Sequence, residues 1–288
     1  MAAATAVVAR ARQPLQWAHI RTVARTDLKQ LAQAKDYWIP MLILGGIFFV
    51  FVPTVLLLTI TQIGNVRAVA QLSQALEILP ASAASQIRGD TETGRAAYAL
   101  AVYLFAPVAV VVPITISTAV GAATIVGERE RGTGEFLAHS PAGIREIFLG
   151  KLVASLIPGY LTTIVGFGIY SLIVNTIVGP DVGGWFFPTR QWWVLMLWVV
   201  PPFLALTLSL VLRLSAKVKS TAAAQQASAL VSLPLIMVAY TQASGSLYGG
   251  DMVAWYIGGI AWLLATVALW RGVRSVTRAR LLGVADEQ

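Results

Sequence analysis

Long runs of apolar residues dominate the chain, and shorter segments between them hold nearly all of its charges. Six windows contain no Asp, Glu, Lys, Arg or His, and they are residues 37–61, 98–126, 152–178, 192–212, 220–244 and 252–270. Each is close to or above the roughly 20 apolar residues that a helix needs to cross a bilayer. The pattern predicts an all-α polytopic membrane protein with six transmembrane helices, in a transmembrane domain over residues 37–271.

Composition agrees with this pattern. Of the 288 residues, 57% are hydrophobic and 12% are charged, about half of the roughly 25% charge of a soluble domain. The chain has no Cys and two His, so thiolate and histidine-built metal centres are excluded and no metal site is expected. The net charge of +8 comes from too few basic residues, 21 in all, to favour a nucleic-acid partner.

The basic residues also predict the orientation. Only Arg67, Arg88, Arg95 and Arg190 fall on one side of a six-span arrangement, and all other Lys and Arg fall on the side of the two termini. Because Lys and Arg near span ends resist translocation, both termini are expected in the cytoplasm, including a tail over residues 272–288. The Ala-, Arg- and Val-rich composition is typical of a bacterial GC-rich genome. The chain is therefore expected in a bacterial plasma (inner) membrane, with the lipid bilayer as one partner.

Residues 1–36 are predicted to hold a cytoplasmic tail and an amphipathic helix. Apolar residues recur at near-helical spacing opposite basic ones, and these are Ile20, Val23, Leu28 and Leu31 against Arg21, Arg25, Lys29 and Lys35. Such a helix can lie on the inner leaflet with its cations over anionic headgroups. The alternative is a simple anchor beside the membrane.

The loop between the second and third windows carries an unusual mixture of charged and apolar residues. Thr133 can cap a helix after the turn at Gly132, and Ser140 and Pro141 can end it. Alternating charges beside exposed apolar residues suit docking to another protein, whereas a plain connector would need only a few solvated charges. The predicted contact residues are Glu128, Arg129, Glu130, Arg131, Gly132, Thr133, Glu135, Phe136, Leu137, His139, Ser140 and Pro141.

The string GERERGTGEFLAHSPAGIREIFLGK resembles the signature of ABC-2 type permeases, the membrane subunits of ABC exporters. The matching residues are Gly127, Glu128, Glu130, Arg131, Gly132, Thr133, Glu135, Leu137, Ser140, Pro141, Glu146, Ile147, Gly150 and Lys151. The resemblance implies that the loop forms a cytoplasmic coupling helix inserted into a cleft of an ATP-binding subunit. It also implies a complex of two permease and two ATPase subunits, with the transport pathway between the two membrane halves.

The sequence places ATP hydrolysis outside this chain. No G-x-x-x-x-G-K-[ST] motif occurs, and the single Gly-Lys pair, Gly150-Lys151, is followed by Leu152 rather than Ser or Thr. The chain is therefore expected to be non-catalytic and to bind no cofactor of its own, with ATP and magnesium held by the partner subunit.

Three other functions fit the sequence less well. A secondary transporter driven by an ion gradient usually holds ionisable groups at membrane depth, and the six windows have none. An intramembrane enzyme needs a nucleophile with a base, and the neighbours His139 and Ser140 do not face each other on a helix. A channel or passive scaffold leaves the mixed-charge loop unexplained.

Polar and aromatic residues within the windows are candidates for the pathway. They are Tyr103, Thr115, Ser117, Tyr170, Asn175, Gln225, Gln226 and Tyr240, of which Tyr103, Tyr170, Asn175, Gln225 and Gln226 are the principal ones. Their alternative role is hydrogen bonding between helices. Because the windows carry no fixed charge, an amphipathic or hydrophobic substrate such as a drug, lipid or peptide is expected.

Overall fold

The computed structural model describes residues 15–62, 84–130, 140–215 and 252–275, with five further residues between 220 and 230. Every regular element in these residues is helical. In chain order the elements are α1 (Trp17–Gln33), α2 (Lys35–Gly46), η1 (Ile47–Phe51), α3 (Val52–Thr61), α6 (Glu92–Ala99), η2 (Leu100–Leu104), α7 (Val108–Glu130), α9 (Ile144–Ile177), α10 (Gly179–Val182), α11 (Arg190–Val194), η3 (Leu195–Val199), α12 (Val200–Ser215) and α14 (Val253–Ser275).

Within the described residues, five helical segments are long and apolar enough to cross a membrane. They are Lys35–Thr61, Glu92–Thr124, Ile144–Ile177, Arg190–Ser215 and Val253–Gly272. Each overlaps one window of the sequence pattern, which supports a multi-pass membrane protein. The remaining window, residues 220–244, lies almost wholly outside the described residues, so the count of six spans stays a prediction.

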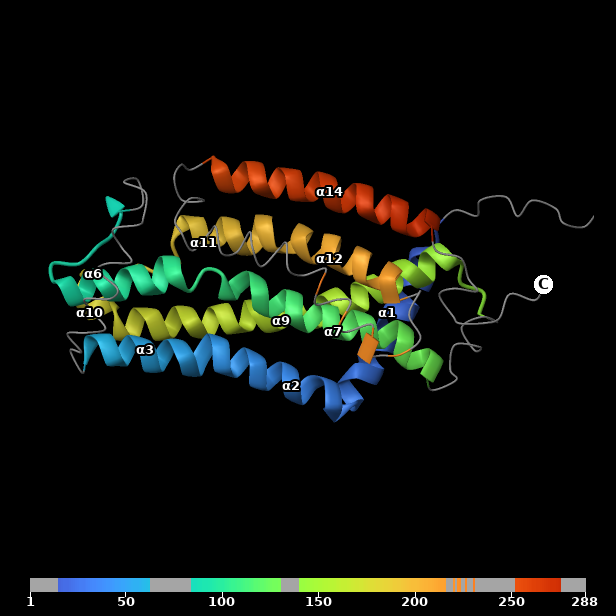
Figure 1. The fold of residues 1–288 in the computed structure, drawn as a ribbon, viewed down its shortest axis with the longest axis horizontal. Helices are drawn as coiled ribbons and strands as arrows, with labels where there is room; N and C mark the ends of the chain where they lie inside the picture. Colours follow the sequence, from blue (N-terminus) through green and yellow to red (C-terminus); the bar gives the residue numbers. More distant parts are fainter. Residues whose placement is uncertain are drawn as a thin grey trace, which may run out of the picture.

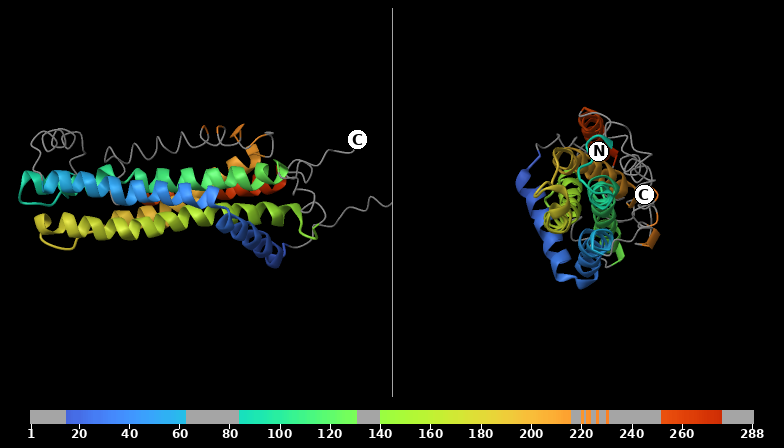
Figure 2. Two further views of the ribbon diagram at one scale, coloured as in Figure 1. Left: turned by 90° about the horizontal axis from the view of Figure 1, so that it is seen from below. Right: turned by 90° about the vertical axis from the view of Figure 1, so that its left-hand side faces the viewer.

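The spans lie side by side along the long axis of the molecule (Figure 1). α9 packs against α7, α1, α3 and α12, and α12 packs against α7 and α14. The C-terminal end of α7, the start of α9 and α1 meet at one end of the bundle, which we call the charged end (Figure 1). Figure 2 shows α1 leaving the bundle axis at an angle there, instead of continuing the line of α2.

Proline shapes three of the spans. The π-helical turns η1, η2 and η3 each end shortly before a proline, and these prolines are Pro53, Pro107 and Pro201. Proline has no N–H and crowds the carbonyl four residues before it, so the preceding turn widens. After η2 the regular helix is interrupted by turns at residues 105–107 before α7 begins.

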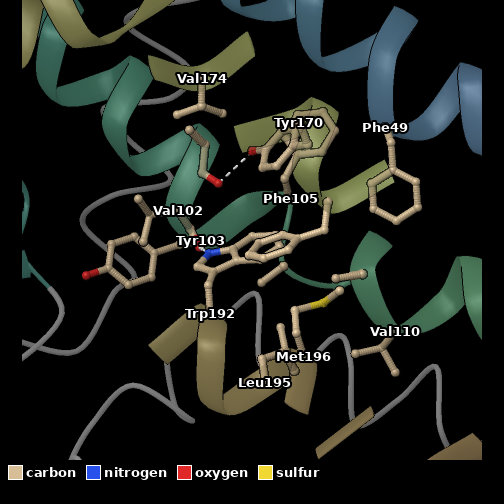
Figure 3. Packing of buried hydrophobic residues seen from close by; sticks show 14 of the residues in the cluster. Phe49, Val102, Tyr103, Phe105, Val110, Tyr170, Val174, Trp192, Leu195 and Met196 are labelled. Atoms are coloured by element: carbon tan, nitrogen blue, oxygen red, sulfur yellow. Dashed lines mark hydrogen bonds between the residues drawn. The ribbon is translucent and has the colours of Figure 1, made fainter. Parts of the chain in front are cut away.

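The core lies where the interrupted second span meets α9 and α11 (Figure 3). The Trp192 ring stacks on Phe167 with centroids 5.7 Å apart and meets Phe187 edge-on at 5.0 Å. The Tyr170 hydroxyl donates a 2.7 Å hydrogen bond to the carbonyl of Ala101 in η2. Aromatic rings in such offset and edge-to-face pairs stabilise the packing beyond the area that they bury.

Candidate functional site

The structure describes both ends of the predicted docking loop, and the loop's middle lies outside the described residues. α7 continues as a helix through Glu130, while Ser140 and Pro141 lie in a bend before α9. Residues 131–139, and with them Arg131, Gly132, Thr133, Glu135, Phe136, Leu137 and His139, lie outside the described part. For Glu128, Arg129 and Glu130 the structure describes the backbone but not the side chains. Contact with an ATPase therefore stays a prediction for all of these residues.

The helix that follows the loop is longer than a membrane span. α9 has 34 residues, which corresponds to about 51 Å at 1.5 Å per residue, whereas the hydrocarbon core is about 30 Å thick. The charged residues of α9 are Arg145, Glu146 and Lys151, all in its first turns. The excess length is thus at the charged end, where α1 packs against α9.

Glu146 holds the beginnings of two helices together. Its Oε2 accepts a 2.8 Å hydrogen bond from the backbone N–H of Gly143, which precedes α9, as in the second half of a capping box. Its Oε1 accepts a 2.8 Å bond from the N–H of Gln16, which precedes α1. The ring Nδ1 of His19 lies 2.7 Å from Oε2. One buried carboxylate therefore faces the positive ends of two helix dipoles.

Gly150 brings α1 close to α9 one turn further along. A Cβ atom at this position would lie 2.7 Å from both Cβ and Cγ1 of Val23 and 3.1 Å from the carbonyl of Ile20. Any larger side chain would push α1 away. Gly150 is one of the residues that match the permease signature, and its close contact with α1 explains why a glycine is needed at this position.

Lys151 is fully buried, at 0% exposed, although it carries a charge. Its Nζ donates a 2.8 Å hydrogen bond to the carbonyl of Thr124 in α7 and lies 3.4 Å from Oδ2 of Asp27 in α1. Asp27 is itself buried. The ammonium group of α9 therefore joins three helices, and its opposite charge lies on α1.

The seam between α7 and α9 continues from this ion pair towards the centre of the bundle. The Ser155 hydroxyl donates to the carbonyl of Lys151 at 2.8 Å and lies 3.5 Å from the hydroxyl of Thr124. A Cβ at Gly121 would lie 3.7 Å from the Cβ of Ser155. Small residues thus let the two helices that flank the loop approach closely, as membrane helices commonly do.

Sequence reasoning missed the partner of Lys151. Asp27 shares one face of α1 with Ile20 and Ala24, and all three are buried. A carboxylate among apolar residues at helical spacing requires an opposite charge nearby, so the sequence held a signal. The apolar face of α1, which we expected on the lipid, packs against α9, and its position on a membrane surface stays a prediction.

Three of the principal candidate pathway residues, Tyr103, Tyr170 and Asn175, are described by the structure and lie away from the charged end. Tyr103 and Tyr170 belong to the buried aromatic core (Figure 3). Asn175 accepts hydrogen bonds from the N–H groups of Phe186 and Phe187 at 2.9 and 3.0 Å, so it ties α9 to the following loop.

The two remaining principal pathway candidates are Gln225 and Gln226. Gln226 is exposed, and Gln225 lies outside the described residues. A transport role for any of the five stays a prediction. Across the described part of the chain, no three His, Asp or Glu side chains are grouped as a metal site would need.

Comparison with known proteins identifies the sequence at the level of a family. A family model described as "ABC-2 family transporter protein" matches residues 21–277, which is most of the chain and includes α1 from Arg21 onward and every described span. The search of curated protein sequences gives no significant match. The family match confirms the resemblance stated from the loop sequence.

Proposed function

Because the chain belongs to the ABC-2 family of transporter proteins, and is thus a permease subunit of an ABC transporter, we propose that it works in an ATP-driven exporter. In this proposal two permease subunits, identical or closely related, enclose the pathway, and two separate ATPase subunits bind ATP and magnesium. The permease contributes no catalytic residue. It turns movement of the ATPases into a change of access across the bacterial plasma (inner) membrane, with both termini cytoplasmic.

One observation carries this proposal beyond the family match. The mixed-charge loop from Glu128 to Pro141 joins α7 to α9, and these two helices pack closely from about two turns beyond the loop, at Thr124 and Lys151, towards the centre of the bundle. Packed helices move as units, so a displacement of the loop by a docked partner would reach both spans. The alternating charges Glu128 to Arg131 offer the partner a complementary surface.

The substrate class follows from the spans. The six windows carry no ionisable residue, so they offer no fixed charge to an inorganic ion or a strongly charged solute. An amphipathic or hydrophobic molecule fits such a pathway. The same absence argues against coupling to an ion gradient, which is the alternative source of energy.

The test is purification of the full chain from its native membrane in mild detergent, with identification of proteins recovered in equal amounts. We expect a P-loop ATPase in the wild-type complex and its loss from the variant Glu130→Ala/Arg131→Ala. A matched control is Glu92→Ala/Arg95→Ala, which removes the same two charges from exposed positions at the opposite end. The control should retain the ATPase.

Two results would contradict the proposal. If the wild-type chain carries no ATPase under conditions that keep other ABC complexes intact, the chain is not part of such a complex. If both double variants lose the ATPase equally, the loop is not its docking site.

A further inference from the structure

Packing alone does not explain why a buried ion pair, Asp27–Lys151, lies at the charged end. Transferring Asp27 and Lys151 from water is costly, and apolar side chains of similar size often stabilise such a site equally well. An ion pair differs from an apolar contact because its geometry is discrete. Here the ammonium lies 2.8 Å from Thr124 O and 3.4 Å from Asp27 Oδ2, and both contacts weaken when the helices separate.

The position of the pair relative to the loop is specific. Thr124 lies in α7 about two turns before the helix ends at Glu130, and Lys151 lies in α9 about two turns after it begins at Ile144. The ammonium therefore joins α7 and α9, the helices on either side of the loop, at about the same distance from the loop in each helix. Asp27 adds α1 to this point, because α1 packs on the same part of α9.

Three contacts between α1 and α9 lie close together in the described residues. Glu146 holds the first turn of α1, Gly150 allows its close approach, and Lys151 binds its Asp27. The face that bears Arg21, Arg25 and Lys29 is exposed. Since α1 packs mainly against α9, these contacts give movement of the loop a direct route to α1.

We propose that Lys151 is a positioning residue for coupling, which links α1 to the two helices that flank the docking loop. When an ATPase displaces the loop, the Asp27–Lys151–Thr124 contact makes α1 follow α7 and α9 as one body. This inference rests on the proposed function, since it assigns a route to movement that begins at the ATPase.

The experiment measures backbone amide exchange in the complex of the full chain with its ATPase, at rest and trapped with ATP and vanadate. In the wild type, trapping should change exchange in residues 131–139 and also in α1, by about fivefold or more in rate, the low end of coupling between sites. In the variant Asp27→Asn/Lys151→Met the loop should still respond, and the change in α1 should fall below about twofold.

The control is Lys35→Met/Asp36→Asn, which makes the same two replacements at exposed positions at the start of α2. It should respond as the wild type does. A purely structural role for Lys151 would raise exchange in α1 equally in both states and leave the difference between the states intact. If the double variant does not fold, Asp27→Ala alone removes the acceptor on α1 and keeps the bond from Lys151 to Thr124.

The outcomes separate the two proposals. A full response of α1 in the folded variant, or no response of α1 in the wild type while the loop responds, overturns the role of Lys151 and leaves the proposed function standing. If no ATPase binds, or if the wild-type loop does not respond to trapping, the proposed function fails and this inference fails with it.

Discussion

The indole Nε1 of Trp192 donates a 2.8 Å hydrogen bond to the carbonyl of Val102, which lies in a different span. In the wider turn of η2, residue i accepts from residue i+5, as the N–H of Phe105 does to Leu100. The i+5 residue of Val102 is Pro107, which has no N–H. Trp192 therefore satisfies a carbonyl that a proline leaves without its helical donor.

The same arrangement recurs in η3. The Tyr160 hydroxyl donates a 3.1 Å bond to the carbonyl of Met196, whose i+5 residue is Pro201. Val200, the i+4 residue, donates its N–H to Leu195 instead. Side chains from neighbouring helices thus complete the backbone hydrogen bonding that spans in a bilayer require.

Replacing Trp192 with Phe should lower the free energy of unfolding by about 1–3 kcal/mol, because the carbonyl of Val102 loses its donor in a buried place. Thermal unfolding of the purified protein in detergent measures the change. The control Trp193→Phe alters a neighbouring ring that is 48% exposed and should cost about 0.5 kcal/mol or less. Equal losses would mean that this hydrogen bond contributes no stability.

Replacing Gly150 with Ala should destabilise the protein by about 1–3 kcal/mol, since the new methyl group overlaps Val23 and α1 must move. Gly168→Ala in the same helix meets no atom within 4 Å and should stabilise by up to about 1 kcal/mol, because Ala is the better helix former. Unfolding curves test both signs. A stable Gly150→Ala would show that α1 is not packed as described.

Replacing Glu146 with Gln should loosen the first turn of α1. The charged acceptor of the Gln16 and Gly143 N–H groups becomes a neutral amide, and the loss is about 1–3 kcal/mol. Limited trypsin digestion measures this as faster cleavage after Arg21. The exposed Glu92→Gln at the opposite end is the control; if it accelerates that cleavage as much, the effect is not local.

Replacing Asn175 with Ala should release the loop that follows α9, because both N–H acceptor contacts to Phe186 and Phe187 are lost. We expect the free energy of unfolding to fall by about 2–3 kcal/mol, as measured by thermal unfolding. Thr176→Ala is the control, since that exposed hydroxyl bonds only within its own helix. An Asn175→Ala protein of unchanged stability and altered substrate selectivity would favour the pathway role.

The membrane class of the protein, its family and the five spans that the structure describes could all be predicted from the sequence. Those features depend on local properties: runs of apolar residues, the placement of Lys and Arg, and a short signature of Gly, Glu and Arg around residues 127–151. A span is apolar along its whole length because lipid surrounds it, so it can be identified without knowing its neighbours.

The contacts of the polar residues in and beside the spans could not be predicted from the sequence. Asp27 and Lys151 are 124 positions apart, and Val102 and Trp192 are 90 apart, so no local pattern pairs them. The helical spacing of apolar residues in α1 is equally compatible with contact to lipid and contact to protein. In the structure this face packs against α9, where Gly150 allows a close approach. Helix packing sets these contacts, because it fixes which buried charges and which carbonyls left free by proline come within hydrogen-bonding distance of a partner.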